Sequence, residues 1–218
     1  MAVTTGQVDS AAVRRWLSAA ADAVAAQRDL LTALDAAIGD GDHGVNMSRG
    51  MSAVRQALAD AGPGTPGGDL VLAGRTLIST VGGASGPLYG AALRGAGRSL
   101  GDGESAAPAQ LAAALGAALE AIRRLGGAEP GDKTMVDAWA PAVAALEAAI
   151  EAGRPLAEAV AAAAAAAEEG MRATVPLRAR KGRASYLGER SEGHQDPGAT
   201  SSALLFRALA DAVGAATL

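Results

Sequence analysis

The 218-residue sequence contains no cysteine, so disulfide bonds and thiol chemistry are excluded and a zinc site is disfavoured. Aromatic residues are almost absent as well: there are two Trp, two Tyr and one Phe. Half of the residues are nevertheless apolar, and most of these are Ala, Leu and Val. Because alanine is the best helix former and is too small to fill the core of a β-sandwich, this composition indicates closely packed helices.

Long basic and long apolar segments are also missing. The most basic stretch, Arg178–Arg183, stands in a chain of net charge −4, which argues against general nucleic-acid binding. The apolar run Ala159–Ala167 is far shorter than a membrane span. Met1–Ser10 shows no signal-peptide pattern. We therefore expect a cytoplasmic protein with no membrane span and no nucleic-acid partner.

The spacing of apolar residues predicts an all-α fold with almost no strand. The first helical stretch has an expected break near Gln27, and no domain boundary is apparent, so residues 1–218 are expected to form a single domain. The eight predicted stretches are approximately Ser10–Leu34, His43–Asp60, Asp69–Thr80, Pro87–Leu100, Pro108–Leu125, Asp132–Glu151, Pro155–Met171 and Pro197–Ala215.

The seven connections between these stretches are of two kinds, which alternate along the chain. Three are ordinary polar turns, at residues 63–68, 101–104 and 153–155. The other four are rich in glycine or charge: Gly39–Gly44, Val81–Gly86, Gly126–Thr134 and Arg178–Gly198. In an up-and-down helical assembly, alternate connections lie at the same end. The four unusual connections are therefore predicted to converge on one mouth.

The first of them carries the strongest chemical signal. Asp35, Asp40 and Asp42 fall within eight residues, and the glycines between them allow a sharp turn on which the side chains can converge. Oxygen ligands without cysteine indicate a hard ion such as Mg²⁺, which usually keeps waters and carries phosphates. We therefore expect a Mg–nucleotide site. The alternative is an acidic turn in which Asp42 caps the next helix and the other carboxylates are solvated.

The helix start that follows these carboxylates and the second unusual connection contain groups suited to phosphate or nucleotide. His43 and Asn46 open a helix and can hold a phosphate or ribose at its N-terminus, although His43 can equally pack or cap. In the segment Gly82–Pro87, Ser85 is a good N-cap and the glycines allow backbone N–H groups to face a phosphate.

The segment Gly126–Met135 is superficially similar to the end of a P-loop. Its spacing is one residue too long and no strand precedes it. We therefore expect Asp132 to cap the following helix, and Met135 either to contact a flat base or to belong to the core.

The longest connection, Arg178–Gly198, places cations around Tyr186 and ends in an Asp-Pro helix start. Long connections in compact domains are usually functional. A cationic segment over a Mg–polyphosphate site would neutralise charge and exclude water. A merely solvated loop would leave the closing Gly193–Gly198 unexplained.

Taken together, four segments resemble the L subunits of dihydroxyacetone kinases. They are Gly39–Gly44, Gly82–Leu88, Glu129–Met135 and Gly182–Thr200, so the resemblance spans nearly the whole chain. It implies an eight-helix antiparallel up-and-down barrel with the nucleotide site at one end.

The resemblance also implies roles for individual residues. Asp35, Asp40 and Asp42 would hold two Mg²⁺ ions that bridge the nucleotide phosphates and, with Arg183, would form the catalytic set. The remaining contacts to ADP or ATP would come from His43, Gly44, Val45, Asn46, Ala84, Ser85, Gly126, Met135, Arg183, Asp196, Pro197 and Gly198.

The reaction implied is transfer of the γ-phosphoryl group to dihydroxyacetone bound on a separate K subunit. In the phosphotransferase-system-dependent form, ADP stays bound and an M subunit rephosphorylates it. Phosphoryl transfer needs positioning and charge neutralisation more than a protein nucleophile, which fits a chain without an evident nucleophile–base pair. Two alternatives stay open: an ATP-dependent dihydroxyacetone or erythrulose kinase subunit with exchangeable ATP, and a nucleotide-dependent interaction module for a transcription regulator.

Overall fold

The computed structural model describes residues 6–214, and nearly all regular structure in this range is helical. The expected end of the last helix at Ala215 lies outside the described residues. The helices are α1 (Ser10–Ala26), α2 (Arg28–Ile38), α3 (His43–Asp60), α4 (Pro66–Thr80), α5 (Ser85–Leu100), α6 (Pro108–Gly126), α7 (Val136–Glu151), α8 (Leu156–Ala173), the 3₁₀ helix η1 (Arg183–Ser191) and α9 (Pro197–Gly214). Strand β1 (Val8–Asp9) pairs antiparallel with β2 (Ser105–Ala106). Between residues 6 and 214, no helix combines the length and apolar character needed to cross a membrane.

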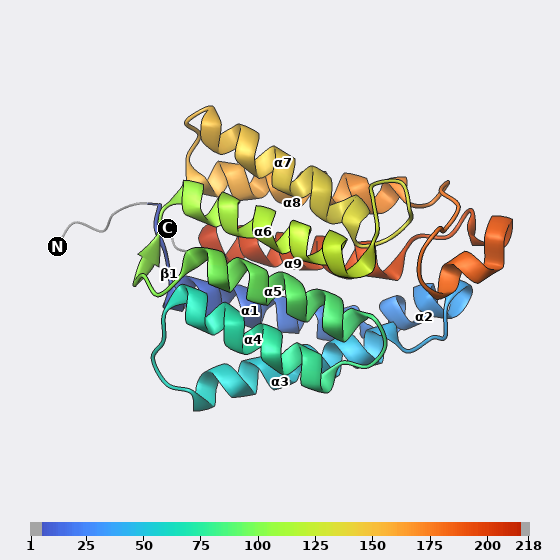
Figure 1. The fold of residues 1–218 in the computed structure, drawn as a ribbon, viewed down its shortest axis with the longest axis horizontal. Coiled ribbons are helices and arrows are strands. Elements are labelled where there is room, and N and C mark those ends of the chain that lie inside the picture. Colours follow the sequence, from blue (N-terminus) through green and yellow to red (C-terminus); the bar gives the residue numbers. More distant parts are fainter. Residues whose placement is uncertain (1–5, 215–218) are drawn as a thin grey trace.

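The helices α1 and α3–α9 form a closed up-and-down ring (Figure 1). Each packs against its neighbour in the sequence, and α9 closes the ring against α1, where the indole Nε1 of Trp16 donates to the carbonyl of Leu205 at 2.8 Å. The expected break at Gln27 separates α1 from α2. Helix α2 leaves the ring and packs on α3 and η1 at one end. The predicted all-α, eight-helix barrel is thus confirmed.

Small residues bring α4 and α5 unusually close together. A Cβ atom added at Gly74 would lie 2.6 Å from the carbonyl oxygen of Gly90, and one added at Gly97 would lie 2.5 Å from that of Gly67. Because such distances are too short for any side chain, the two backbones touch directly along this seam. The larger core side chains gather elsewhere, for example where Trp139 meets Phe206 edge to face at 4.9 Å.

Two helices are capped by a residue that lies outside the stretch predicted from the sequence. Asp9, the residue before the predicted stretch, caps α1, since its carboxylate accepts the amide of Ala12 at 2.8 Å. The expected start of α4 at Asp69 was wrong: the helix begins at Pro66, and Thr65 caps it. Proline at the first helical position loses no hydrogen bond, so the helix starts three residues earlier than its apolar pattern indicates.

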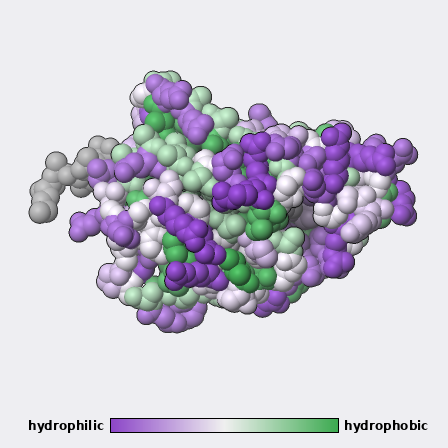
Figure 2. Space-filling view, viewed as in Figure 1, coloured by the Kyte–Doolittle hydropathy of each residue, from purple (hydrophilic) through white to green (hydrophobic). Residues whose placement is uncertain are grey.

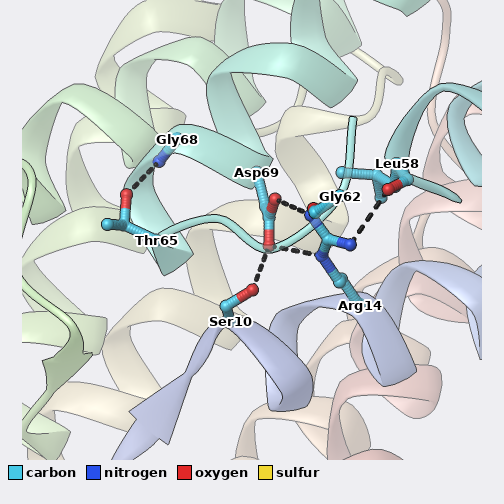
Figure 3. A network of polar contacts seen from close by, with 7 residues as sticks. All are labelled: Ser10, Arg14, Leu58, Gly62, Thr65, Gly68 and Asp69. Atoms are coloured by element: carbon cyan, nitrogen blue, oxygen red, sulfur yellow. Dashed lines mark hydrogen bonds and ion pairs between the residues drawn. The ribbon is translucent and has the colours of Figure 1, made fainter. Parts of the chain in front are cut away.

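Asp69 instead anchors a polar network at the far end of the barrel (Figure 3). Its two carboxylate oxygens accept from Arg14 at 2.8 and 2.7 Å, and Ser10 donates to one of them at 2.6 Å. Arg14 also donates to the carbonyls of Leu58 and Gly62. The network ties α1 to the α3–α4 turn, and loss of Arg14 would leave the buried carboxylate of Asp69 without its charged partner, which is expected to destabilise the fold.

The two ends of the barrel differ in character, as the alternation of connections predicted. The two strands and the polar turns lie at the end with the Asp69 network, whereas α2, η1 and the four unusual connections lie at the other (Figure 1). Figure 2 shows hydrophilic side chains gathered over the end where η1 lies. We call the connection between α8 and α9, residues 174–196, the basic loop.

Candidate functional site

A cavity of about 600 Å³ opens at this end of the barrel. Residues from all four unusual connections line it, which confirms their predicted convergence. Such a volume is typical of sites for small molecules and cofactors. One wall is apolar and includes Leu88, Ile122 and Met135, whereas the rim carries carboxylates and cations.

The three carboxylates of the first connection meet at this rim. Asp35 lies in the last turn of α2, and Asp40 and Asp42 follow in the turn to α3. One oxygen from each lies within 4.8 Å of the others. The backbone must pass very close to reach this arrangement, since a Cβ at Gly39 would lie 2.1 Å from Asp35 Oδ1. An all-oxygen, all-acidic donor set at this spacing fits a hard divalent cation such as Mg²⁺.

Asp35 has a second role, as the cap of α3. Its Oδ2 accepts the backbone amides of Asp42 at 2.8 Å and of His43 at 3.1 Å. The side chain of Asp42 makes no capping bond, so the alternative in which Asp42 caps this helix was wrong. The carboxylate oxygens of Asp42 therefore stay available at the rim.

His43 is buried behind these carboxylates and joins two other elements. Its Nδ1 lies 3.1 Å from Ser85 Oγ at the start of α5, and its Nε2 lies 2.8 Å from Ser201 Oγ in α9. Burial lowers the pKa of His43 and outweighs the opposing effect of the Asp35 and Asp42 charges, so the imidazole is neutral at pH 7. Ser85 contacts His43 with its side chain and makes no capping bond to α5, which corrects its expected role as N-cap.

A chain of buried hydroxyl groups continues from Ser201 across the barrel. The hydroxyl of Tyr89 lies 2.7 Å from Ser201 Oγ and 2.8 Å from Ser202 Oγ, and Trp139 Nε1 donates to Ser202 at 3.0 Å. Burial also raises the pKa of Tyr89, so this phenol stays protonated. The sequence prediction missed these residues because single hydroxyl groups in helical patterns carry no recognisable motif.

The turn before α7 is organised differently from the prediction. The helix begins at Val136, not at Asp132, and Asp137 binds the turn by accepting the amides of Gly131 at 2.5 Å and Thr134 at 2.7 Å. Asp132 accepts the amide of Glu129 at 3.0 Å and so closes the turn itself; its expected role as the cap of α7 was wrong.

The basic loop reaches back to the carboxylates. Arg183 Nε lies 3.0 Å from Asp40 Oδ2, so a cation of η1 crosses the mouth of the cavity. At the end of the loop, Asp196 Oδ2 accepts the amide of Ala199 at 2.7 Å in the first turn of α9. Burial raises the pKa of Asp196 to about 7.

The structure brings most of the predicted site residues to the cavity. The residues that line it are Asp35, Asp40, Asp42, His43, Ala84, Ser85, Gly126, Met135, Arg183, Asp196, Pro197 and Gly198. Gly44, Val45 and Asn46 do not line it. Gly44 packs against the backbone of α2, Val45 is exposed, and Asn46 accepts a hydrogen bond from Arg49 at 2.7 Å.

Comparison with known proteins gives concordant matches. The model of the family described as the DAK2 domain matches residues 37–211. The chain is 45% identical over 195 residues to the ADP-binding subunit DhaL of PEP-dependent dihydroxyacetone kinase 1 from Listeria innocua, covering 89% of this chain and 92% of that one. It is 43% identical to the ADP-binding subunit DhaL of the PEP-dependent dihydroxyacetone kinase from Escherichia coli, with 89% and 93% coverage.

A solved structure shares the fold. The dihydroxyacetone kinase of C. freundii in complex with AMP-PNP and Mg²⁺ superposes with a TM-score of 0.71 at 28% identity. The match covers 97% of this chain but only 36% of that kinase, so the chain spans about a third of the solved protein.

Proposed function

The chain belongs to the DAK2 domain family, and on that premise we propose that it is the ADP-binding subunit of a PEP- and PTS-dependent dihydroxyacetone kinase. It holds Mg²⁺ with ADP or ATP at the mouth of the barrel and transfers the γ-phosphoryl group to dihydroxyacetone. The observation that carries the proposal is the convergence of Asp35, Asp40 and Asp42 at the rim of a nucleotide-sized cavity.

The chemical character of each residue at the rim suggests its role in the proposed reaction. Asp35, Asp40 and Asp42 would hold two Mg²⁺ ions, whose charge would offset that of the polyphosphate. Ser85 lies behind them at the N-terminus of α5, where backbone N–H groups can also face a phosphate. Arg183 would stabilise the charge that develops on the transferred group, because its side chain is 70% exposed and can move from Asp40 toward a phosphate.

The apolar wall suits the base of the nucleotide. Leu88, Ile122 and Met135 line the cavity, Ile122 and Met135 are buried, and Gly126 adds a position without a side chain. Apolar contacts of this kind stabilise a bound adenine ring, and the flexible side chain of methionine packs well on an aromatic surface. Gly44 and Val45 would contribute through the backbone of the first turn of α3 rather than through the cavity wall, whereas the amide of Asn46 already donates to Asp42 O at 2.9 Å.

The proposed assembly places this subunit between two partners. A K subunit would bind dihydroxyacetone and meet the mouth of the barrel, and an M subunit of the phosphotransferase system would rephosphorylate the bound ADP. The chain would act as one domain, residues 1–218, in the cytoplasm.

The experiment that tests this function is a measurement of nucleotide content. Freshly purified protein is desalted and denatured with acid, and the released ADP and ATP are quantified by chromatography. Near-stoichiometric ADP supports a retained coenzyme that an M-type donor rephosphorylates. A protein that is empty but binds Mg–ATP would instead support the subunit with exchangeable ATP. A protein that binds neither nucleotide in the presence of Mg²⁺ would contradict the assignment of the site.

A further inference from the structure

Lys133 occupies an unusual place in the turn before α7. Its side chain is buried, and its backbone has φ +61°, a conformation that residues other than glycine rarely adopt. The ammonium group donates to the carbonyl oxygens of Thr174 at 2.7 Å, Val175 at 3.3 Å and His194. An ammonium group has three N–H donors, and in this structure all three are directed to protein carbonyls.

These carbonyl groups mark the two ends of the basic loop. Thr174 and Val175 begin it, and His194 lies two residues before its end. Direct bonds between the two ends support the same closure: Gly193 N donates to Val175 O at 2.8 Å, and Asp196 N donates to Thr174 Oγ1 at 3.0 Å. We call the place where the two ends of the basic loop meet the neck. Lys133 lies at this neck, and its ammonium group joins both ends of the loop to the turn before α7.

The loop beyond the neck is folded as a unit. The hydroxyl of Ser191 is fully buried, accepts the amide of Ala179 at 2.9 Å and donates to Gly188 O at 2.6 Å. Arg180 N donates to the carbonyl of Asp132 at 3.0 Å, which fixes the loop a second time to the residue beside Lys133. The orientation of η1, and with it the reach of Arg183 to Asp40, thus depends on a neck that Lys133 holds.

We propose that Lys133 is a positioning residue: it closes the neck of the basic loop and thereby holds Arg183 over the carboxylate cluster. Lys133 is among the residues that line the cavity, but its ammonium group is directed to the carbonyl groups of the neck, and in this role it does not contact the nucleotide. The proposal rests on the proposed function for the role of Arg183. It also assigns the lysine of this P-loop-like turn differently from a P-loop lysine, whose ammonium group binds phosphate directly. Glycine would suit the backbone angle better, so the amine is the feature that requires lysine here.

Hydrogen exchange of the nucleotide-free protein tests the neck directly. We expect Lys133→Met to speed exchange of the amides of Ala179, Arg180 and Gly193 by about tenfold or more, with the helices α4 and α5 unchanged. The matched control is Lys181→Met. Lys181 is the chain's other lysine, is exposed and lies within the loop, so its substitution should leave these amides as protected as in the wild type. Unchanged protection in Lys133→Met would overturn the proposal.

Lys133→Gly separates the amine from the backbone and serves if Lys133→Met does not fold. It relaxes the turn at φ +61° but removes the three hydrogen bonds to the neck. We expect the same loosened loop. A loop that is as protected as in the wild type would mean that only the turn matters, which overturns the role of the amine.

A double-mutant cycle tests whether Lys133 acts through Arg183. The affinity for Mg–ADP is measured for Lys133→Met, Arg183→Ala and the double variant. If Lys133 only positions Arg183, the double variant should bind as Arg183→Ala does, within about twofold. If the affinity losses of the two single variants multiply in the double variant, Lys133 contacts the nucleotide independently of Arg183, and the proposal is overturned. If even the wild type binds no nucleotide, the proposed function fails, while the exchange experiment still decides the role of the neck.

Discussion

Arg183 and Asp40 face each other across the mouth of the cavity, with Nε 3.0 Å from Oδ2. Asp40 is also one of the three carboxylates that converge within 4.8 Å. A divalent cation bound by these carboxylates would compete with the guanidinium for the same oxygen. A cation bound there would therefore release Arg183 from Asp40, and the position of the basic loop would depend on occupancy of the proposed metal site.

Replacing Arg183 should accordingly have opposite effects on metal binding and on transfer. Arg183→Ala removes the competing charge, and because the pair is exposed we expect the affinity for Mg²⁺ alone to rise only about twofold to fivefold. Phosphoryl transfer should fall by about 100- to 1,000-fold, since a charge-stabilising donor is lost. Calorimetry with Mg²⁺ and an assay with the partner subunits measure the two effects. Arg190→Ala, at an exposed arginine of the same loop, is the control that should change neither.

Asp40→Asn should abolish most Mg²⁺-dependent nucleotide binding while the fold persists. The amide is isosteric but cannot carry the negative charge that a hard cation prefers, and even changes outside the ligand shell weaken metal sites by about 10- to 100-fold. We expect a loss of at least about 100-fold, read by titration with Mg–ADP, with an unchanged helical circular dichroism spectrum. Asp22→Asn removes a carboxylate that is also ion-paired with an arginine, Arg55, but lies on the barrel wall and is more exposed than Asp40, at 69% against 38%; this variant should bind normally. Normal binding by Asp40→Asn would remove Asp40 from the metal site.

The arrangement of the connections was predictable because it follows from chain topology. Once the helices were counted and the glycine-rich and charged segments were seen to alternate with plain turns, their convergence required no knowledge of side-chain contacts. The cluster of Asp35, Asp40 and Asp42 was predictable for a similar reason, since a short glycine-containing turn leaves three nearby carboxylates little room to separate.

Individual hydrogen bonds were not predictable where several residues compete for one role. Asp35 and Asp42 could both cap α3, and only the folded geometry selects Asp35. Lys133 stands in a turn whose sequence is similar to a phosphate-binding one, but its partners are carbonyl groups about 40 and 60 residues away in the sequence. Local patterns contain no signal for contacts at that separation.

Stability should depend on pH through Asp196. Burial, with the Asp137 charge adding to it, raises its pKa from the ordinary 3.8 to about 7, although Lys133 opposes this. Between pH 4 and 7 the folded protein therefore holds a proton that the unfolded chain releases, so this group lowers the free energy of unfolding as the pH rises through that range. Asp196→Asn keeps an oxygen for the amide of Ala199 but cannot titrate.

The stability of Asp196→Asn relative to the wild type should accordingly rise from pH 4 to pH 7 and level off above it, by no more than about 4 kcal/mol in all. Urea unfolding at several pH values measures this difference. Because His43 titrates in both proteins, its contribution cancels in the comparison. A difference that stays constant across the range would mean that Asp196 has an ordinary pKa in the folded protein.

At the seam between α4 and α5, we expect replacement of a glycine by alanine to destabilise the fold, although the same replacement in a helix usually stabilises it. Glycine to alanine in a helix normally stabilises by about 0.5–1 kcal/mol, and Gly116→Ala in α6 should do so because the nearest atom to an added Cβ, Glu147 Oε1, lies at 3.5 Å. Gly74→Ala instead places a methyl group 2.6 Å from the carbonyl oxygen of Gly90, which can yield only if the two helices separate. We expect a loss of about 1–3 kcal/mol in thermal or urea unfolding. Equal stabilisation by both substitutions would mean that the two backbones do not touch at this seam.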